Sequence, residues 1–113
     1  MIAEDITTTT TIWILEDHEV FAKQIRRLIG AEDDMTCPHH FPSASDLYDK
    51  LKFTNERPDI LLLDLGLPRR DGLDVLKDIR TIMPDVKVLI LTSFDDREKV
   101  YRVRSLRQTQ VHQ

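Results

Sequence analysis

The sequence lacks a second cysteine and a long hydrophobic run, and both absences limit the classes of protein to which it can belong. Cys37 has no second thiol to pair with, which excludes an internal disulfide and agrees with a reducing compartment. No apolar stretch approaches the ~18 residues of a membrane-spanning helix. The first residues, MIAEDITTTTT, also lack the basic and apolar regions of a signal peptide. We therefore expect a cytoplasmic protein with no membrane partner.

Basic residues are also fewer than acidic ones, with 16 lysines and arginines against 20 aspartates and glutamates. The 113 residues carry a formal net charge of −4, which argues against broad nucleic-acid binding by this chain alone. A chain of this length forms one domain around one hydrophobic core. We expect a flexible segment over residues 1–10, a folded domain over 11–102 and a polar tail over 103–113.

The hydrophobic pattern alternates along the chain between the period of a strand and that of a helix. Strand patterns occur at TIWIL (11–15), MTCPHHF (35–41), DILLL (59–63) and VKVLIL (86–91), and a helical stripe follows each of them. The first stripe ends at Gly30 and comprises Val20, Phe21, Ile25, Leu28 and Ile29. This order predicts an α/β doubly wound parallel sheet.

Polar residues follow three of the four predicted strands. Glu16 and Asp17 come after the first strand, Asp64 after the third, and Thr92 and Ser93 after the fourth. In a doubly wound sheet the carboxyl ends of the strands share one edge, where binding sites form. Each pair of carboxylates about 4 Å apart costs about 4 kcal/mol at an effective dielectric constant of about 20. The sequence therefore predicts a cation at this edge.

The oxygen donors at these strand ends favour Mg²⁺ as that cation. A carboxylate beside bound Mg²⁺ can act as a nucleophile toward a phosphoryl group and form an aspartyl phosphate. The hydroxyl of Thr92 is placed to donate a hydrogen bond to a phosphoryl oxygen. The alternative is that the acids only cap helices and form turns, but three matched strand ends favour a site.

Three segments resemble, in order and spacing, the motifs of the receiver domain of two-component response regulators. They are LEDH (15–18), DLGLPRRDG (64–72) and LTSFDD (91–96), and the resemblance extends from residue 12 to about residue 102. It implies a flavodoxin-like sheet of strand order 2-1-3-4-5. It also implies that Asp64 is a phosphoacceptor, phosphorylated by a sensor histidine kinase to switch an output.

The resemblance implies further roles at the same edge of the sheet. Mg²⁺ is expected to be held by Asp17, Asp64 and the backbone carbonyl of Gly66, with Glu16 assisting through water. Thr92 is expected to be the switch hydroxyl. We expect Mg²⁺-dependent self-phosphorylation from a phosphodonor rather than conventional enzyme turnover. The resemblance is strongest to regulators with a DNA-binding domain behind the receiver, so DNA would be bound only through a domain absent from this chain.

The end of the sequence departs from the receiver pattern. Receivers continue after the fourth helix with a fifth strand that ends in lysine and a fifth helix. Here no lysine follows Lys99, no glycine follows Gly72 and no apolar run follows Leu91. We therefore expect a sheet without the fifth strand and fifth helix. The exposed face of the fourth strand and fourth helix would then favour a homodimer.

Three alternatives remain beside the phosphoacceptor interpretation. A phosphatase of the haloacid-dehalogenase type needs a second acid two residues after its nucleophile, and Gly66 occupies that position. A phosphorylated histidine at His18 is less favoured than a positioning role beside the two acids. A receiver-like interaction module that is never phosphorylated is compatible with the missing lysine. The substitution Asp64→Asn separates it from the signalling interpretation, which alone predicts loss of response.

Overall fold

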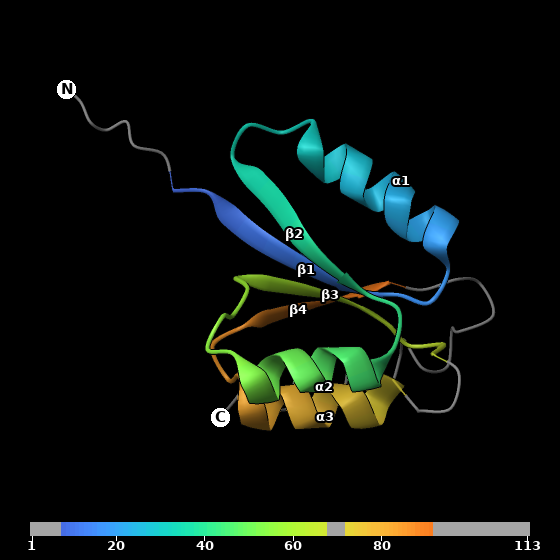
Figure 1. Cartoon of the computed structure of the whole chain (residues 1–113), viewed down its shortest axis with the longest axis vertical. Helices are drawn as coiled ribbons and strands as arrows, with labels where there is room; N and C mark the ends of the chain where they lie inside the picture. Colours follow the sequence, from blue (N-terminus) through green and yellow to red (C-terminus); the bar gives the residue numbers. More distant parts are fainter. Residues whose placement is uncertain (1–7, 68–71, 92–113) are drawn as a thin grey trace, which may run out of the picture.

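A parallel sheet forms the centre of the structure, a computed structural model that describes residues 8–67 and 72–91 (Figure 1). The described elements are β1 (Thr10–Leu15), α1 (Glu19–Gly30), β2 (Met35–Phe41), α2 (Ala44–Phe53), β3 (Ile60–Asp64), α3 (Gly72–Ile82) and β4 (Lys87–Leu91). Strands and helices alternate, which confirms the predicted order as far as β4.

The strands lie in the order β2-β1-β3-β4, and each neighbouring pair is parallel. Helix α1 lies on one face of the sheet, and α2 and α3 lie side by side on the opposite face (Figure 1). This arrangement confirms the doubly wound, flavodoxin-like fold. The predicted absence of a fifth strand and fifth helix concerns residues 92–113, which lie outside the described part of the chain.

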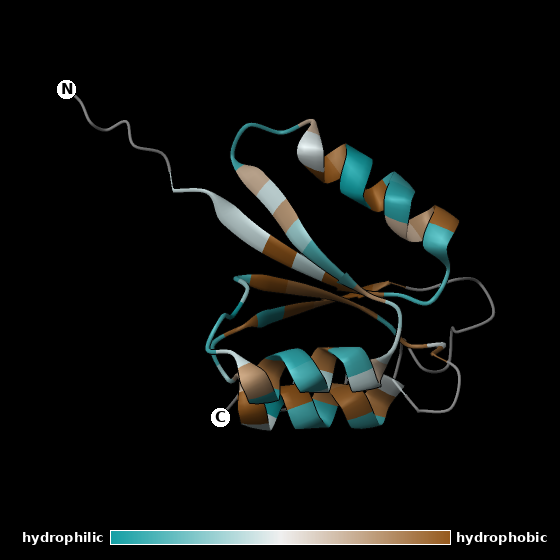
Figure 2. Ribbon diagram, viewed as in Figure 1, coloured by the Kyte–Doolittle hydropathy of each residue, from teal (hydrophilic) through white to brown (hydrophobic). Residues whose placement is uncertain are grey.

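Two hydrophobic clusters lie on the two faces of the sheet. The larger one fills the space between the sheet and helices α2 and α3, and it includes Trp13, Leu61, Leu63, Leu76 and Ile79. The smaller one lies beneath α1 and is built from Ile12, Ile14 and Ile29. Strand β3 contributes to both and is hydrophobic until its last residue (Figure 2). A strand that is buried on both faces accounts for the unbroken apolar run in its sequence.

The predicted inner face of α1 is partly wrong. The structure leaves three members of the predicted stripe exposed: Val20, Phe21 and Leu28. The residues that face the sheet are instead Ala22, Ile25 and Ile29, which share one side of a helix. The helix ends at Gly30 as predicted, but its buried stripe runs through a small alanine instead of the larger Val20.

Gly72, the first residue of α3, lies against the backbone just after β3. A Cβ atom added at Gly72 would lie 2.5 Å from the Cα of Leu65 and 2.9 Å from its carbonyl oxygen. A side chain of any size would collide with the backbone there. The close approach therefore positions α3 against the residue that follows Asp64.

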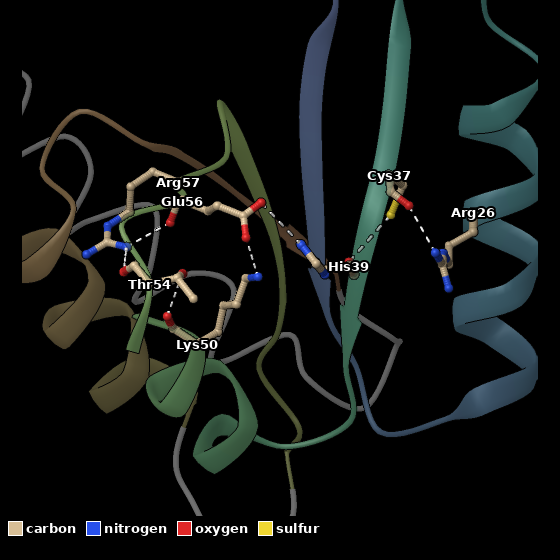
Figure 3. Close-up of polar contacts among 7 residues, drawn as sticks. All are labelled: Arg26, Cys37, His39, Lys50, Thr54, Glu56 and Arg57. Carbon is tan, nitrogen blue, oxygen red and sulfur yellow. Dashed lines mark hydrogen bonds and ion pairs between the residues drawn. The ribbon is translucent and has the colours of Figure 1, made fainter. Parts of the chain in front are cut away.

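Strand β2 forms one edge of the sheet, and its pairing with β1 shifts register between Thr11 and Trp13, opposite the segment that contains Pro38. Proline is tolerated at edge strands and at such irregularities. Nη2 of Arg26 donates a 3.0 Å hydrogen bond to the carbonyl oxygen of Cys37 (Figure 3). The Cys37 thiol is half-buried and donates to the carbonyl oxygen of His39. These contacts indicate a structural role for Cys37 at this edge of the sheet.

The start of β1 can be compared with the predicted boundary between the N-terminal segment 1–10 and the folded domain. Thr10 pairs with Met35 in the sheet, so the first strand begins at the last residue of the segment expected to be flexible. The polar tail expected over 103–113 lies outside the described residues. None of the described helices is long and apolar enough to cross a membrane.

Candidate functional site

The carboxyl ends of β1 and β3 bring the predicted acids together. Leu15 of β1 pairs with Leu63 of β3, so the residues that follow them are neighbours across the two strands. Glu16, Asp17 and Asp64 lie with His18 in one cluster, in which one ligand atom from each residue lies within 4.8 Å of the others. The structure thus brings together all three carboxylates that the sequence places at strand ends, and it adds the imidazole of His18.

Glu16 is the most firmly held member of this cluster. Its backbone N–H donates to the carbonyl oxygen of Phe41 at 3.0 Å, and its own carbonyl oxygen lies 2.7 Å from Nε2 of His40. Its Oε2 lies 2.9 Å from the backbone nitrogen of His18 and 3.0 Å from Nδ1 of the same residue. The residue is only 3% exposed. Glu16 therefore presents a buried carboxylate in a fixed orientation.

Asp64 is a nearly buried carboxyl group at the last position of β3. It is 8% exposed, and its Oδ1 accepts a 2.8 Å hydrogen bond from the backbone N–H of Gly66. Burial, together with the neighbouring Glu16 and Asp17, raises the pKa of Asp64 to about 6, against the opposing effect of the Gly66 N–H. Because ionisation is costly at this position, the Asp64 carboxylate favours a partner that carries positive charge.

Asp17 carries an oxygen that the described residues do not satisfy. Its Oδ1 is buried and accepts no hydrogen bond in the described part of the chain, although it lies 3.5 Å from Nδ1 of His18. Buried polar oxygens normally have a hydrogen-bond donor or a bound ion. Carboxylate oxygens are the ligands that Mg²⁺ takes in proteins. The donor set and this oxygen therefore fit a hard divalent cation.

His18 lies at the solvent side of the cluster, with its side chain 76% exposed. The hydrogen bond to Glu16 raises the pKa of His18, and the charge of Asp17 adds to that effect. The sequence analysis assigned His18 a positioning role and did not include it among the metal ligands. The position of His18, directly after two acids at a strand end, is the sequence feature that places it beside the cluster.

The described residues do not test the roles predicted for two groups of the site, the Thr92 hydroxyl and the Gly66 carbonyl oxygen. Thr92 lies outside the described residues. Gly66 lies two residues after Asp64 and contacts it through its N–H, whereas coordination of a metal by its carbonyl oxygen stays a prediction. Sequence reasoning also missed His40, which contacts the backbone of Glu16 from the neighbouring strand. A strand register would have been needed to find that contact.

A second polar group lies beside β2 and the end of α2 (Figure 3). Glu56 contacts the ammonium of Lys50 and lies 3.8 Å from Nε2 of His39. The contact with Lys50 lowers the pKa of Glu56. Thr54 and Arg57 donate to backbone carbonyl oxygens nearby. These contacts connect the chain after α2 to the sheet. Because Glu56 is 60% exposed, the group does not form an enclosed site.

Comparison with known sequences shows which protein family this chain matches. Residues 12–111 match the profile of the response regulator receiver domain. The transcriptional regulatory protein YxjL of Bacillus subtilis is 33% identical over 88 residues, which cover 78% of this chain and 39% of YxjL. The chain therefore spans about two fifths of the length of this relative.

Solved structures share the same architecture. The receiver domain of AraT, a response regulator from Geobacillus stearothermophilus, superimposes with a TM-score of 0.73 at 24% identity, over 88% of this chain and 76% of that one. RcsB, solved as two dimers bound to two parallel DNAs, gives a TM-score of 0.78 at 20% identity, over 88% of this chain and 50% of RcsB. At these identities the likeness establishes the fold.

Proposed function

This chain belongs to the response regulator receiver domain family, and we propose that Asp64 accepts a phosphoryl group from a histidine kinase in a Mg²⁺-dependent reaction. The observation that carries the proposal is the position of Asp64. Its carboxyl group is nearly buried at the end of β3, has a pKa raised to about 6, and lies with Glu16 and Asp17 in one cluster. A nucleophile and a candidate cation site meet there.

The proposed reaction is a transfer between two side chains. A carboxylate oxygen of Asp64 attacks phosphorus, a new P–O bond forms, and the P–N bond of the donor phosphohistidine breaks with its electron pair passing to the imidazole nitrogen. The Gly66 N–H, 2.8 Å from Oδ1, keeps the carboxylate oriented during the attack. Bound Mg²⁺ supplies neutralisation of the charge on the phosphoryl oxygens.

We assign the metal to Asp17, Asp64 and the carbonyl oxygen of Gly66, with Glu16 acting through water. The Oδ1 of Asp17 supports this assignment, since it is buried at the cluster and finds no hydrogen-bond donor among the described residues. The fixed carboxylate of Glu16 supports a role in orienting metal-bound water. Thr92, as the switch hydroxyl, would contact the phosphoryl group.

We also propose that phosphorylation controls an output through a second copy and a further domain. The RcsB structure contains dimers on DNA. For this chain we propose a cytoplasmic homodimer through the face of the fourth strand and fourth helix, with DNA bound by an output domain distinct from the receiver. An interaction module that is never phosphorylated is not favoured, because it does not explain why three carboxylates lie together in one cluster.

The test is intact mass spectrometry of the chain after incubation with Mg²⁺ and phosphoramidate. We expect a single phosphoryl adduct that is absent in Asp64→Asn and absent with chelator. Asp85→Asn is a matched control, because Asp85 is an exposed carboxylate at the opposite ends of the strands. No adduct in a sample that circular dichroism shows to be folded would overturn the proposal and favour the interaction module.

A further inference from the structure

We propose that His18 is a direct ligand of the bound metal through Nδ1, and that this nitrogen gives the cluster a preference for divalent transition ions over Mg²⁺. The inference rests on the metal site of the proposed function and adds the kind of ion that it selects. It concerns a residue that the assignment to Asp17, Asp64 and Gly66 leaves out.

The first argument is the spacing of the donor atoms. Nδ1 of His18 lies 3.0 Å from Oε2 of Glu16 and 3.5 Å from Oδ1 of Asp17. Two ligand atoms at right angles around an ion, each about 2.1 Å from it, lie about 3 Å apart. The 3.5 Å separation from Oδ1 of Asp17 is near that of adjacent ligands of one ion. The 3.0 Å contact with Oε2 of Glu16 is a hydrogen bond that holds the ring beside Asp17 and that a bound ion would replace.

The second argument is the buried oxygen of Asp17. Oδ1 accepts no hydrogen bond in the described part of the chain, and it is the Asp17 oxygen that lies 3.5 Å from the His18 ring nitrogen. An ion shared by these two atoms would satisfy both. The His18 side chain is 76% exposed, so its ring can adjust by a few tenths of an ångström without disturbing the core.

The third argument is the anchoring of the His18 backbone. Its N–H donates to Oε2 of Glu16 at 2.9 Å, the same oxygen that Nδ1 approaches. Residue 18 is thus held over the cluster by a contact that does not depend on its side chain. The start of α1 delivers the ring to the site, and replacing the ring leaves that backbone contact in place.

The chemistry of the donors sets the direction of the preference. Carboxylate oxygens and water suit Mg²⁺, whereas imidazole nitrogen suits later first-row ions, whose affinity for a given nitrogen and oxygen site rises through the series from Mn²⁺ toward Cu²⁺. A cluster of three carboxylates and one imidazole should therefore bind Co²⁺ more tightly than Mg²⁺. The oxygen ligands alone would discriminate less.

The experiment measures the dissociation constants of Mg²⁺ and Co²⁺ by titration calorimetry for the full chain, His18→Gln and His40→Gln. We expect the preference for Co²⁺ to fall about tenfold or more in His18→Gln, in line with the cost of disturbing a metal ligand. His40→Gln is the matched control, because His40 contacts only the backbone of Glu16 among the acids and should change both constants alike. Thermal unfolding of each variant verifies folding.

A spectroscopic readout tests ligation directly. Proton NMR of the Co²⁺ complex should show a strongly shifted ring N–H signal from a coordinated imidazole, and the signal should be absent in His18→Gln. Binding of both ions without that signal, or an equal loss of both affinities in His18→Gln, would overturn the inference and leave His18 a positioning residue for Glu16. Failure to bind either ion would instead overturn the metal site of the proposed function, and this inference with it.

Discussion

A methyl group at Gly72 would lie 2.5 Å from the Cα of Leu65, closer than nonbonded carbon atoms approach. Leu65 directly follows Asp64, so the first residue of α3 is in contact with the backbone that leaves the site. The size of the residue at position 72 therefore affects the geometry around Asp64 as well as the packing of α3.

Gly72→Ala should lower the free energy of unfolding by about 1–3 kcal/mol, the usual cost of overpacking. The backbone of Leu65 has to move to admit the methyl group, so phosphorylation of Asp64 should slow as well. Urea unfolding and the intact-mass assay measure the two effects. Gly30→Ala is the control, because nothing lies within 4 Å of a Cβ atom there. Equal stability of the two variants would contradict the steric argument.

Asp64→Asn should stabilise the metal-free chain at neutral pH. The Asp64 pKa is about 6 in the fold against an ordinary 3.8, so the folded state binds the proton more tightly than the unfolded state. The free energy of unfolding therefore falls as pH rises between these values, by up to about 3 kcal/mol. Asparagine removes that loss.

Urea unfolding with chelator at pH 4 and pH 7 measures this effect. The gain from Asp64→Asn should be small at pH 4, where Asp64 is protonated in the fold, and near its maximum at pH 7. A gain of the same size at both pH values would show that ionisation of Asp64 is not its cause.

Divalent cations should stabilise the fold through Asp17. A ligand that binds only the folded state at about one hundred times its dissociation constant adds about 2.7 kcal/mol. The midpoint of thermal unfolding should therefore rise with Mg²⁺ concentration in the natural chain and in Asp85→Asn. In Asp17→Asn the rise should be largely lost. A full rise in Asp17→Asn would place the bound ion elsewhere.

Ser43→Ala should destabilise the fold by about 1 kcal/mol through the loss of a helix cap. Ser43 precedes α2, and its Oγ accepts a 3.2 Å hydrogen bond from the backbone N–H of Asp46. Ser45→Ala is the control, because Ser45 is exposed within the same helix and alanine is a better helix former. Chemical unfolding of both variants measures the difference, and a neutral Ser43→Ala would contradict the capping role.

The parallel, doubly wound sheet and the meeting of the acids could be predicted, because both follow from the order of the hydrophobic patterns and from the acids at the strand ends. The strand order is implied by the resemblance to receiver domains. The apolar run before Asp64 indicates a strand buried on both faces, and parallel strands place Glu16 and Asp64 at one edge. The Ser43 cap was likewise recognisable, because a capping side chain acts on the residue three positions later in its own helix.

Contacts that depend on the exact docking of one element against another could not be predicted. The buried side of α1 is decided by how closely the helix approaches the sheet, which favoured Ala22 over Val20. The contact of His40 with Glu16 depends on the register of β2 against β1. The steric demand at Gly72 arises from a distance between two backbones that no sequence pattern states.

The protection of the β2 edge has a consequence for how copies of this chain can associate. The guanidinium of Arg26 donates to the Cys37 carbonyl, so one backbone acceptor of β2 is already occupied. A strand from another molecule would therefore find an incomplete hydrogen-bonding template beside β2. Copies of this chain are therefore expected to associate through surfaces other than the β2 edge.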